Sequence, residues 1–208
     1  MVDINSQDAD GNTPLMKIII DKEVTNVKNM LENHKSTINP NKKNKEGKTA
    51  LMLLCSYDVD MYMTSEDYRG PNTVLNLVNS LLTLNADVNM KDNEGCTALM
   101  LAAKYCHSLL VNRLLVTNRV SDINEKTNSF FSPSTAFDLA NEDSNNYRKG
   151  VGPYKDTEDY MLRTRKKYVL DTLKKAMENK PVSDGSRSKR RKADGRRKSK
   201  GRRSIILR

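Results

Sequence analysis

The stretch that decides the fold is Glu-Gly-Cys-Thr-Ala-Leu-Met at residues 94–100, because the chain repeats it. Residues 10–16 read Asp-Gly-Asn-Thr-Pro-Leu-Met, and residues 46–52 read Glu-Gly-Lys-Thr-Ala-Leu-Met. A fainter fourth copy, Ser-Thr-Ala-Phe-Asp-Leu-Ala, occupies residues 134–140. Successive aligned threonines are 36, 48 and 38 residues apart. A period in the thirties with variable insertions is typical of a solenoid of stacked units.

Each copy predicts a turn followed by a short helix. Glycine two positions before the threonine suits a turn that needs a positive φ. The threonine hydroxyl can cap free amides at a helix start. Pro14 stands at the first helical position, where its missing amide costs nothing. We therefore expect short apolar first helices around residues 51–55 and 99–103.

A second helix is predicted in each unit by apolar residues at i, i+3 and i+4, which bury one face of a helix. These residues are Val27, Met30 and Leu31, then Val78, Leu81 and Leu82, then Val111, Leu114 and Leu115. A connection then returns to the next turn, and in it an aliphatic residue precedes an asparagine, as in Val88-Asn89.

The Gly-x-Thr-(Pro/Ala)-Leu turn, the Val-x-x-(Leu/Met)-Leu helix and the segment Asn-Ala-Asp-Val-Asn at residues 85–89 resemble the ankyrin repeat family. The resemblance covers residues 1–140 well and 141–180 weakly. It implies an all-α solenoid of hairpin–helix–helix units at approximately residues 8–40, 44–90, 92–125 and 127–180. The pattern also resembles the degenerate ankyrin proteins of large DNA viruses and AT-rich protists.

The chain departs from the family pattern in three ways. The family's usual histidine is replaced by Met16, Met52 and Met100, which puts polar bridging between units in doubt. The second unit holds an insertion of about 15 residues relative to a 33-residue unit, around residues 57–73. The fourth unit has a polar interruption at 142–157, after which we expect a helix at 158–178 with three inward residues, Tyr168, Val169 and Leu173.

The charge is concentrated at the C-terminal end. The chain carries 36 Lys+Arg against 26 Asp+Glu, and residues 183–208 hold 12 of the basic residues with only two acids. Residues 1–182 are therefore neutral, with 24 residues of each sign. A segment with this composition has too little apolar surface to fold alone. We predict a disordered basic tail at residues 181–208.

The tail has several possible roles. Its two basic clusters are typical of a nuclear import signal read by an import receptor. The same charge could bind nucleic-acid phosphates or anionic membrane surfaces, or could simply keep the chain soluble. No aromatic residue interleaves the clusters, so the tail offers no base stacking. The candidate residues are Lys189, Arg190, Arg191, Lys192, Arg196, Arg197 and Lys198.

The resemblance also implies a partner surface, because partners of this family bind the turn tips and the exposed side of the first helices. The corresponding residues are Lys17, Lys48, Leu53, Asn93, Leu101, Lys104 and Tyr105. The insertion adds Tyr57 and Tyr62, since tyrosine is favoured at interface anchors. The alternative is that several of these residues pack between units, and that Tyr62 covers an extended helix.

Other classes of protein are not favoured. The longest apolar runs are only a few residues, too short to span a bilayer, and the N-terminus lacks the features of a signal peptide. Three cysteines without paired spacing fit a reducing compartment. The two histidines are far apart and no phosphate-binding glycine loop is present. We expect no catalytic residues, metal or cofactor.

The sequence thus predicts a monomeric, intracellular, non-catalytic protein–protein interaction module, an adaptor or host-interaction protein. Its tail would direct it to the nucleus, although a cytoplasmic location stays open. The alternative is a nucleic-acid-associated protein that binds phosphate backbones through the tail.

Overall fold

The computed structural model describes residues 3–56, 72–129, 132–141 and 155–179. Helices and their connections make up these residues, which contain no strand, and the predicted all-α fold is confirmed. The helices are α1 (Pro14–Ile20), α2 (Val24–Asn33), α3 (Ala50–Ser56), α4 (Asn72–Thr83), α5 (Ala98–Lys104), α6 (Ser108–Val116), α7 (Ala136–Asn141) and α8 (Lys155–Asn179).

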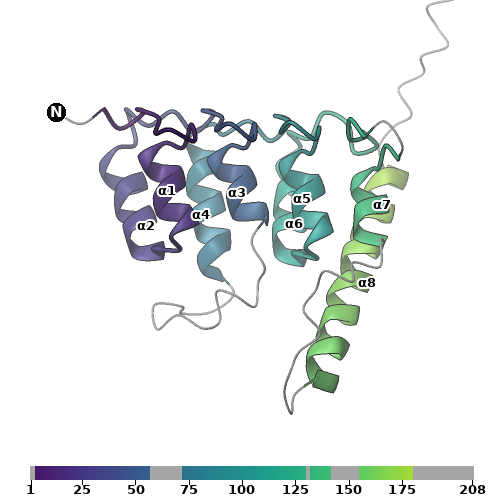
Figure 1. Cartoon of the computed structure of the whole chain (residues 1–208). Helices are drawn as coiled ribbons and strands as arrows, with labels where there is room; N and C mark the ends of the chain where they lie inside the picture. The colour runs from purple at the N-terminus through teal and green to yellow at the C-terminus, as the bar shows by residue number, and fades with distance from the viewer. Residues whose placement is uncertain (1–2, 57–71, 130–131, 142–154, 180–208) are drawn as a thin grey trace, which may run out of the picture.

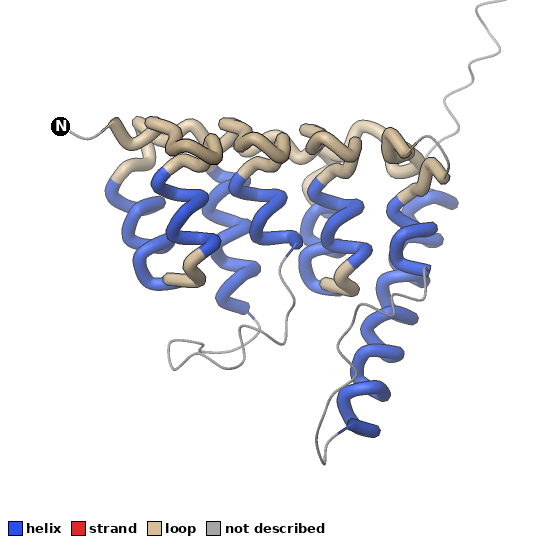
Figure 2. The backbone as a smooth tube through the Cα atoms, viewed as in Figure 1, coloured by secondary structure: helices blue, strands red, loops and turns tan. Residues whose placement is uncertain are grey.

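The helices form two layers. In one layer α1, α3, α5 and α7 contact one another in sequence, and in the other α2, α4, α6 and α8 do the same. Each helix of the first layer also contacts the helix that follows it in the chain. The connections between units lie in a row along one edge of the stack (Figures 1 and 2), and α8 extends beyond the other helices. This arrangement is a linear solenoid, as the repeat predicted.

The first helices begin at the aligned threonines. The Thr97 hydroxyl accepts from the backbone N–H of Met100 (3.3 Å), and the Met100 sulfur accepts from the backbone N–H of Thr97 (3.5 Å). Thr49 and Met52 form the same pair. The methionines therefore do more than fill apolar space: their sulfur atoms are weak acceptors that complete a capping box.

Each of the first three turns is closed by a side chain. In the third unit the Asp92 carboxylate accepts from the backbone N–H of Glu94 (3.0 Å) and of Cys96 (2.8 Å). Asp8 and Asn44 occupy the same place in the first two turns. These side chains hold the backbone in the turn conformation before the helix begins.

Glycine is required within these turns. Gly95 has a φ of +80°, and a Cβ added there would lie 2.6 Å from the backbone nitrogen of Asn128 in the following connection. Both the backbone conformation and the close approach of the neighbouring unit therefore exclude a side chain.

Asparagine side chains join successive connections. The Asn41 side chain donates to the carbonyl of Asn85 (3.3 Å) and accepts from the backbone N–H of Asp87 (2.8 Å). Asn5 and Asn89 bridge to the next connection in the same way. Each bridge satisfies one donor and one acceptor of the neighbouring backbone, so polar contacts between units persist without the family's histidine.

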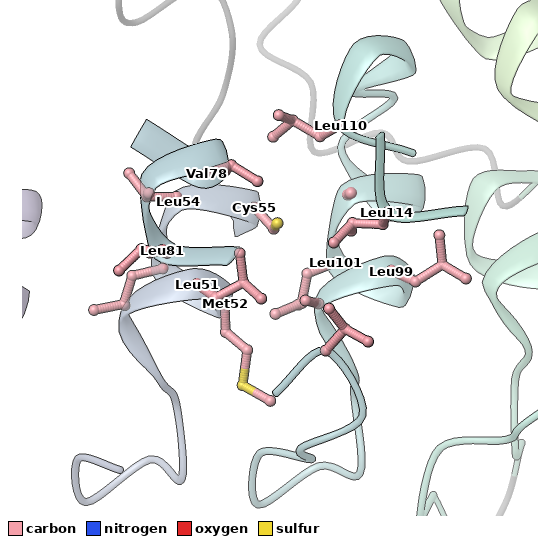
Figure 3. Close-up of a cluster of buried hydrophobic side chains, with 14 of the residues drawn as sticks. Leu51, Met52, Leu54, Cys55, Val78, Leu81, Leu99, Leu101, Leu110 and Leu114 are labelled. Carbon is pink, nitrogen blue, oxygen red and sulfur yellow. The ribbon is translucent and has the colours of Figure 1, made fainter. Parts of the chain in front are cut away.

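The core lies between the two layers (Figure 3). Leu51 and Leu54 of α3 meet Val78 and Leu81 of α4, and all four side chains are buried. The predicted second-helix stripes are buried or partly buried in the first three units. The core is therefore continuous along the stack. Neighbouring units bury the apolar faces that a single unit would leave exposed.

One prediction about the inward side of α8 is wrong. Val169 and Leu173 are fully buried as expected, but Tyr168 is 52% exposed. The buried stripe continues to the partly buried Ala176 and Met177, at i+3 and i+4 from Leu173. Because neighbouring helical residues point about 100° apart, Tyr168 falls outside the stripe that contains Val169.

Candidate partner-binding surface

The candidate surface follows the turns and the layer of first helices. Lys17 on α1 and Asn93 in the third turn are exposed, whereas Lys48, Lys104 and Tyr105 are partly exposed. The Asn93 side chain also donates to the carbonyl of Lys45 in the second turn (2.8 Å). These side chains are positioned by rigid, capped turns and short helices.

Two predicted contact residues lie in the core instead. Leu53 is 6% exposed and Leu101 is 5% exposed, so neither can offer its side chain to a partner. In α3 every side chain from Ala50 to Cys55 is buried, because the seven-residue helix lies between two neighbouring first helices and its own second helix. The prediction that these two leucines belong to an exposed surface is wrong.

Charged groups from the second and third units lie close together around Lys48. Its ammonium group pairs with the Glu46 carboxylate at 2.8 Å. Partial burial acts to lower the pKa of Lys48, but the hydrogen bond to Glu46 and the charges of Glu46 and Asp92 outweigh it and raise that pKa. Lys48 therefore stays protonated beside carboxylates of two units.

A pocket of about 470 Å³ opens between the third and fourth turns. It includes the predicted residues Asn93 and Lys104, which the structure brings to one site. The other lining residues, which the sequence did not indicate, are Glu94, Cys96, Thr127, Asn128, Ser129, Ser132, Ser134 and Leu139.

The pocket borders a widened fourth turn. The third turn closes with a hydrogen bond from the Asp92 N–H to the carbonyl of Cys96, whereas the fourth closes from the Thr127 N–H to the carbonyl of Ser134, both at 3.0 Å. The fourth turn therefore spans three more residues. Pro133 stands where the other units have glycine. This missing glycine is the sequence signal that could have indicated an altered turn.

The lining residues suit binding through hydrogen bonds. Six of the ten lining residues carry hydroxyl or amide side chains, and the charged residues are Glu94 and Lys104. Burial, together with the charges of Asp92 and Glu94, raises the pKa of the Cys96 thiol to about 11, so this thiol is neutral at physiological pH. A neutral thiol is a poor nucleophile.

Several predicted residues lie outside the described part of the chain. They are Tyr57 and Tyr62 of the insertion and the tail residues Lys189, Arg190, Arg191, Lys192, Arg196, Arg197 and Lys198. Among the residues that are described, no group of three His, Cys, Asp or Glu could hold a metal ion. Within the same residues, no helix has both the length and the apolar character needed to cross a bilayer.

Comparison with known families matches residues 94–128 to the ankyrin repeat. The matched segment begins and ends at two residues joined across the pocket, since the Asn128 N–H donates to the carbonyl of Glu94 at 2.9 Å. No curated protein matches the chain. Ankyrin repeats are protein-interaction domains and are generally not enzymes. Residues 94–128 thus match an ankyrin repeat, and the two-layered stack repeats the same turn and helix pair in the neighbouring units.

Proposed function

We propose that this protein binds a partner protein through its first-helix layer, with the pocket between the third and fourth turns as the anchoring point. The pocket itself carries this proposal. It places hydroxyl and amide groups around an opening that includes one acidic and one basic side chain, Glu94 and Lys104. Such a site fits a polar side chain or a backbone segment of a partner.

Predicted contact residues outside the pocket lie on the same face of the stack. Lys17, Lys48 and Tyr105 occur on the same layer of first helices and turns, at successive units. The short helices and capped turns fix their backbones, so little conformational entropy is lost when a partner binds. The face is therefore preorganised, with the pocket at one end.

The test compares two exposed charge reversals. Glu94→Lys changes the pocket, and Glu32→Lys makes the same charge change on α2 in the other layer. We expect quantitative affinity purification to recover the same partner with the unchanged protein and with Glu32→Lys, and at least tenfold less with Glu94→Lys. Equal recovery by both variants, with unchanged thermal melts, would reject the pocket as the anchor.

The second part of the proposal is that the basic tail acts as a nuclear import signal, supported by its two clusters of Lys and Arg. Deleting residues 187–208 should abolish nuclear accumulation of a fusion with a carrier too large to diffuse through nuclear pores. The deletion should leave partner recovery unchanged, because the residues that line the pocket lie between Asn93 and Leu139. An unaltered nuclear fraction would reject the import role.

A nucleic-acid role for the tail is the competing proposal, because its charge can neutralise phosphates without sequence preference. It predicts binding to oligonucleotides that weakens steeply with salt and disappears when residues 187–208 are deleted. Exposed lysines on α8 also favour a nucleic-acid role and would add a folded segment to the contact made by the tail.

A further inference from the structure

The positive charge of the chain begins on α8 rather than in the tail. Residues 163–208 hold 19 Lys+Arg and four Asp+Glu, a net charge of +15. Residues 1–162 hold 17 basic and 22 acidic residues, a net charge of −5. The chain is therefore an acidic stack followed by a basic segment whose first part, up to Asn179, is helical.

The exposed side of α8 carries part of this charge. Val169 and Leu173 are buried where α8 contacts α6 and α7, so the opposite side of the helix faces outward. Lys167, Lys174 and Lys175 are exposed there, and Asp171 lies among them. Lys167, Lys174 and Lys175 take part in neither of the ion pairs Lys48–Glu46 and Lys91–Glu125.

Tyr168 stands within this basic surface, with 52% of its area exposed. Helical spacing places Lys175 two turns from Tyr168 on the same side, about 10 Å along the axis. Lys167 and Lys174 have the same separation on the adjacent side. An exposed aromatic ring between lysines combines a stacking surface with groups that attract phosphates.

We propose that the exposed side of α8, defined by Lys167, Tyr168, Lys174 and Lys175, binds single-stranded nucleic acid. Tyr168 stacks on an unpaired base, and the lysines contact phosphates on either side. The tail supplies charge but no aromatic residue, so the two segments contribute different parts of one interaction. A base within a duplex is already stacked on its neighbours, and for this reason the ring selects a single strand.

The folded helix also gives the site a defined geometry. Its residues are held by a backbone that α6 and α7 fix through Val169 and Leu173. The tail can attract any polyanion, whereas the α8 surface discriminates between stacked and unstacked bases. The inference extends the nucleic-acid proposal for the tail, and the two fail in different experiments.

The first test uses the full-length chain, a fluorescent oligothymidylate and fluorescence anisotropy over a range of salt concentrations. The double variant Lys167→Glu/Lys174→Glu is compared with Lys28→Glu/Lys35→Glu, which reverses two exposed lysines in or after α2 at the far end of the stack. We expect the α8 variant to bind at least tenfold more weakly, with a salt slope about 1.4 smaller for two lost phosphate contacts. Equal weakening by both variants would overturn the α8 site.

The second test isolates the ring. Tyr168→Ala should weaken binding to oligothymidylate about fivefold or more, while Tyr168→Phe keeps the unchanged affinity. Neither substitution should alter binding to a duplex of the same charge. An equal loss with Phe and Ala, or an equal loss on the duplex, would overturn stacking.

Deletion of residues 187–208 separates this inference from the tail proposal. Oligonucleotide binding that the deletion removes, while both α8 variants bind as the unchanged protein does, supports the tail and rejects the α8 site. Residual binding by the truncated chain that depends on Tyr168 supports the α8 site. Tighter binding to vesicles containing anionic lipid than to oligothymidylate at equal salt would assign the surface to membranes and overturn the inference.

Discussion

The third and fourth turns each lead into a first helix, but different residues close them. In the third turn, Gly95 supplies a positive φ and Asp92 closes a short loop. In the fourth, Thr127 closes a loop three residues longer, and its hydroxyl accepts from the backbone N–H of Ser134 at 3.0 Å. Both turns still deliver a threonine to the start of a first helix. The repeat therefore conserves the helix start and tolerates a change in the loop before it.

The difference matters because the longer turn borders a pocket. Gly95 brings the third turn so close to Asn128 that no side chain fits between them. Beside this contact the longer fourth turn borders the pocket that holds Lys104 and Glu94. The degenerate fourth repeat thus contributes to a concave feature of the stack.

Among substitutions that test the difference between the third and fourth turns, Gly95→Ala should cost the most stability. The new methyl group would be strained at φ +80° and would meet the Asn128 backbone at 2.6 Å. We expect a loss of about 3 kcal/mol in the free energy of unfolding, measured by urea denaturation. Pro133→Ala, at the same alignment position in the fourth turn, should change it by less than about 0.5 kcal/mol. Equal effects would mean that the two turns are equally constrained.

An intermediate effect should follow removal of the side chains that close the turns. Asp92→Ala deprives two backbone N–H groups of their acceptor, one of them on the buried Cys96. It should cost about 2 kcal/mol, whereas Thr127→Val, which removes one acceptor, should cost about 1 kcal/mol. Thermal unfolding of both variants checks the order, and a larger cost for Thr127→Val would contradict it.

The smallest expected effect concerns the fourth helix start. The Asp138 carboxylate accepts from the backbone N–H of Thr135 (2.9 Å) and from its hydroxyl (2.8 Å), and these hydrogen bonds lower the pKa of Asp138. In the third unit the neutral sulfur of Met100 takes the equivalent place. The start of α7 therefore favours an ionised side chain, whereas the start of α5 uses a neutral acceptor.

This difference gives a pH dependence. Because the folded-state pKa of Asp138 is lowered, its contribution is present above the unfolded-state value of about 4 and is lost as pH falls through the folded-state value. Asp138→Ala should destabilise the protein by about 0.5 kcal/mol at pH 7 and by less below pH 3. Denaturation at both pH values measures this, and an unchanged difference would exclude the carboxylate as the cause.

Much of the fold followed from local pattern. The Gly-x-Thr turns and the apolar stripe of Val78, Leu81 and Leu82 predicted short paired helices, and both features are present in the structure. Such features depend on neighbours a few residues apart, so their physics is visible in the sequence. The capping role of the methionines was missed, because a sulfur acceptor is weak and its use depends on the rotamer.

The candidate site was less predictable. Leu53 and Leu101 occupy positions that the family pattern assigns to the exposed face, yet neighbouring helices cover them. Tyr168 was expected to face inward and faces outward. Asn93 and Lys104 were identified singly, but only folding brings Asn128 and Ser132 to the same pocket.

The sequence by itself determined the number of repeated turns, the start of each first helix and the separation of charge along the chain. These properties depend on residue type and spacing alone. Only the tertiary structure decided which apolar residues are covered, how the fourth turn lies against the third, and that a tyrosine faces outward among the lysines of α8. The physical reason is that burial and pocket shape depend on contacts between units, which local periodicity does not specify.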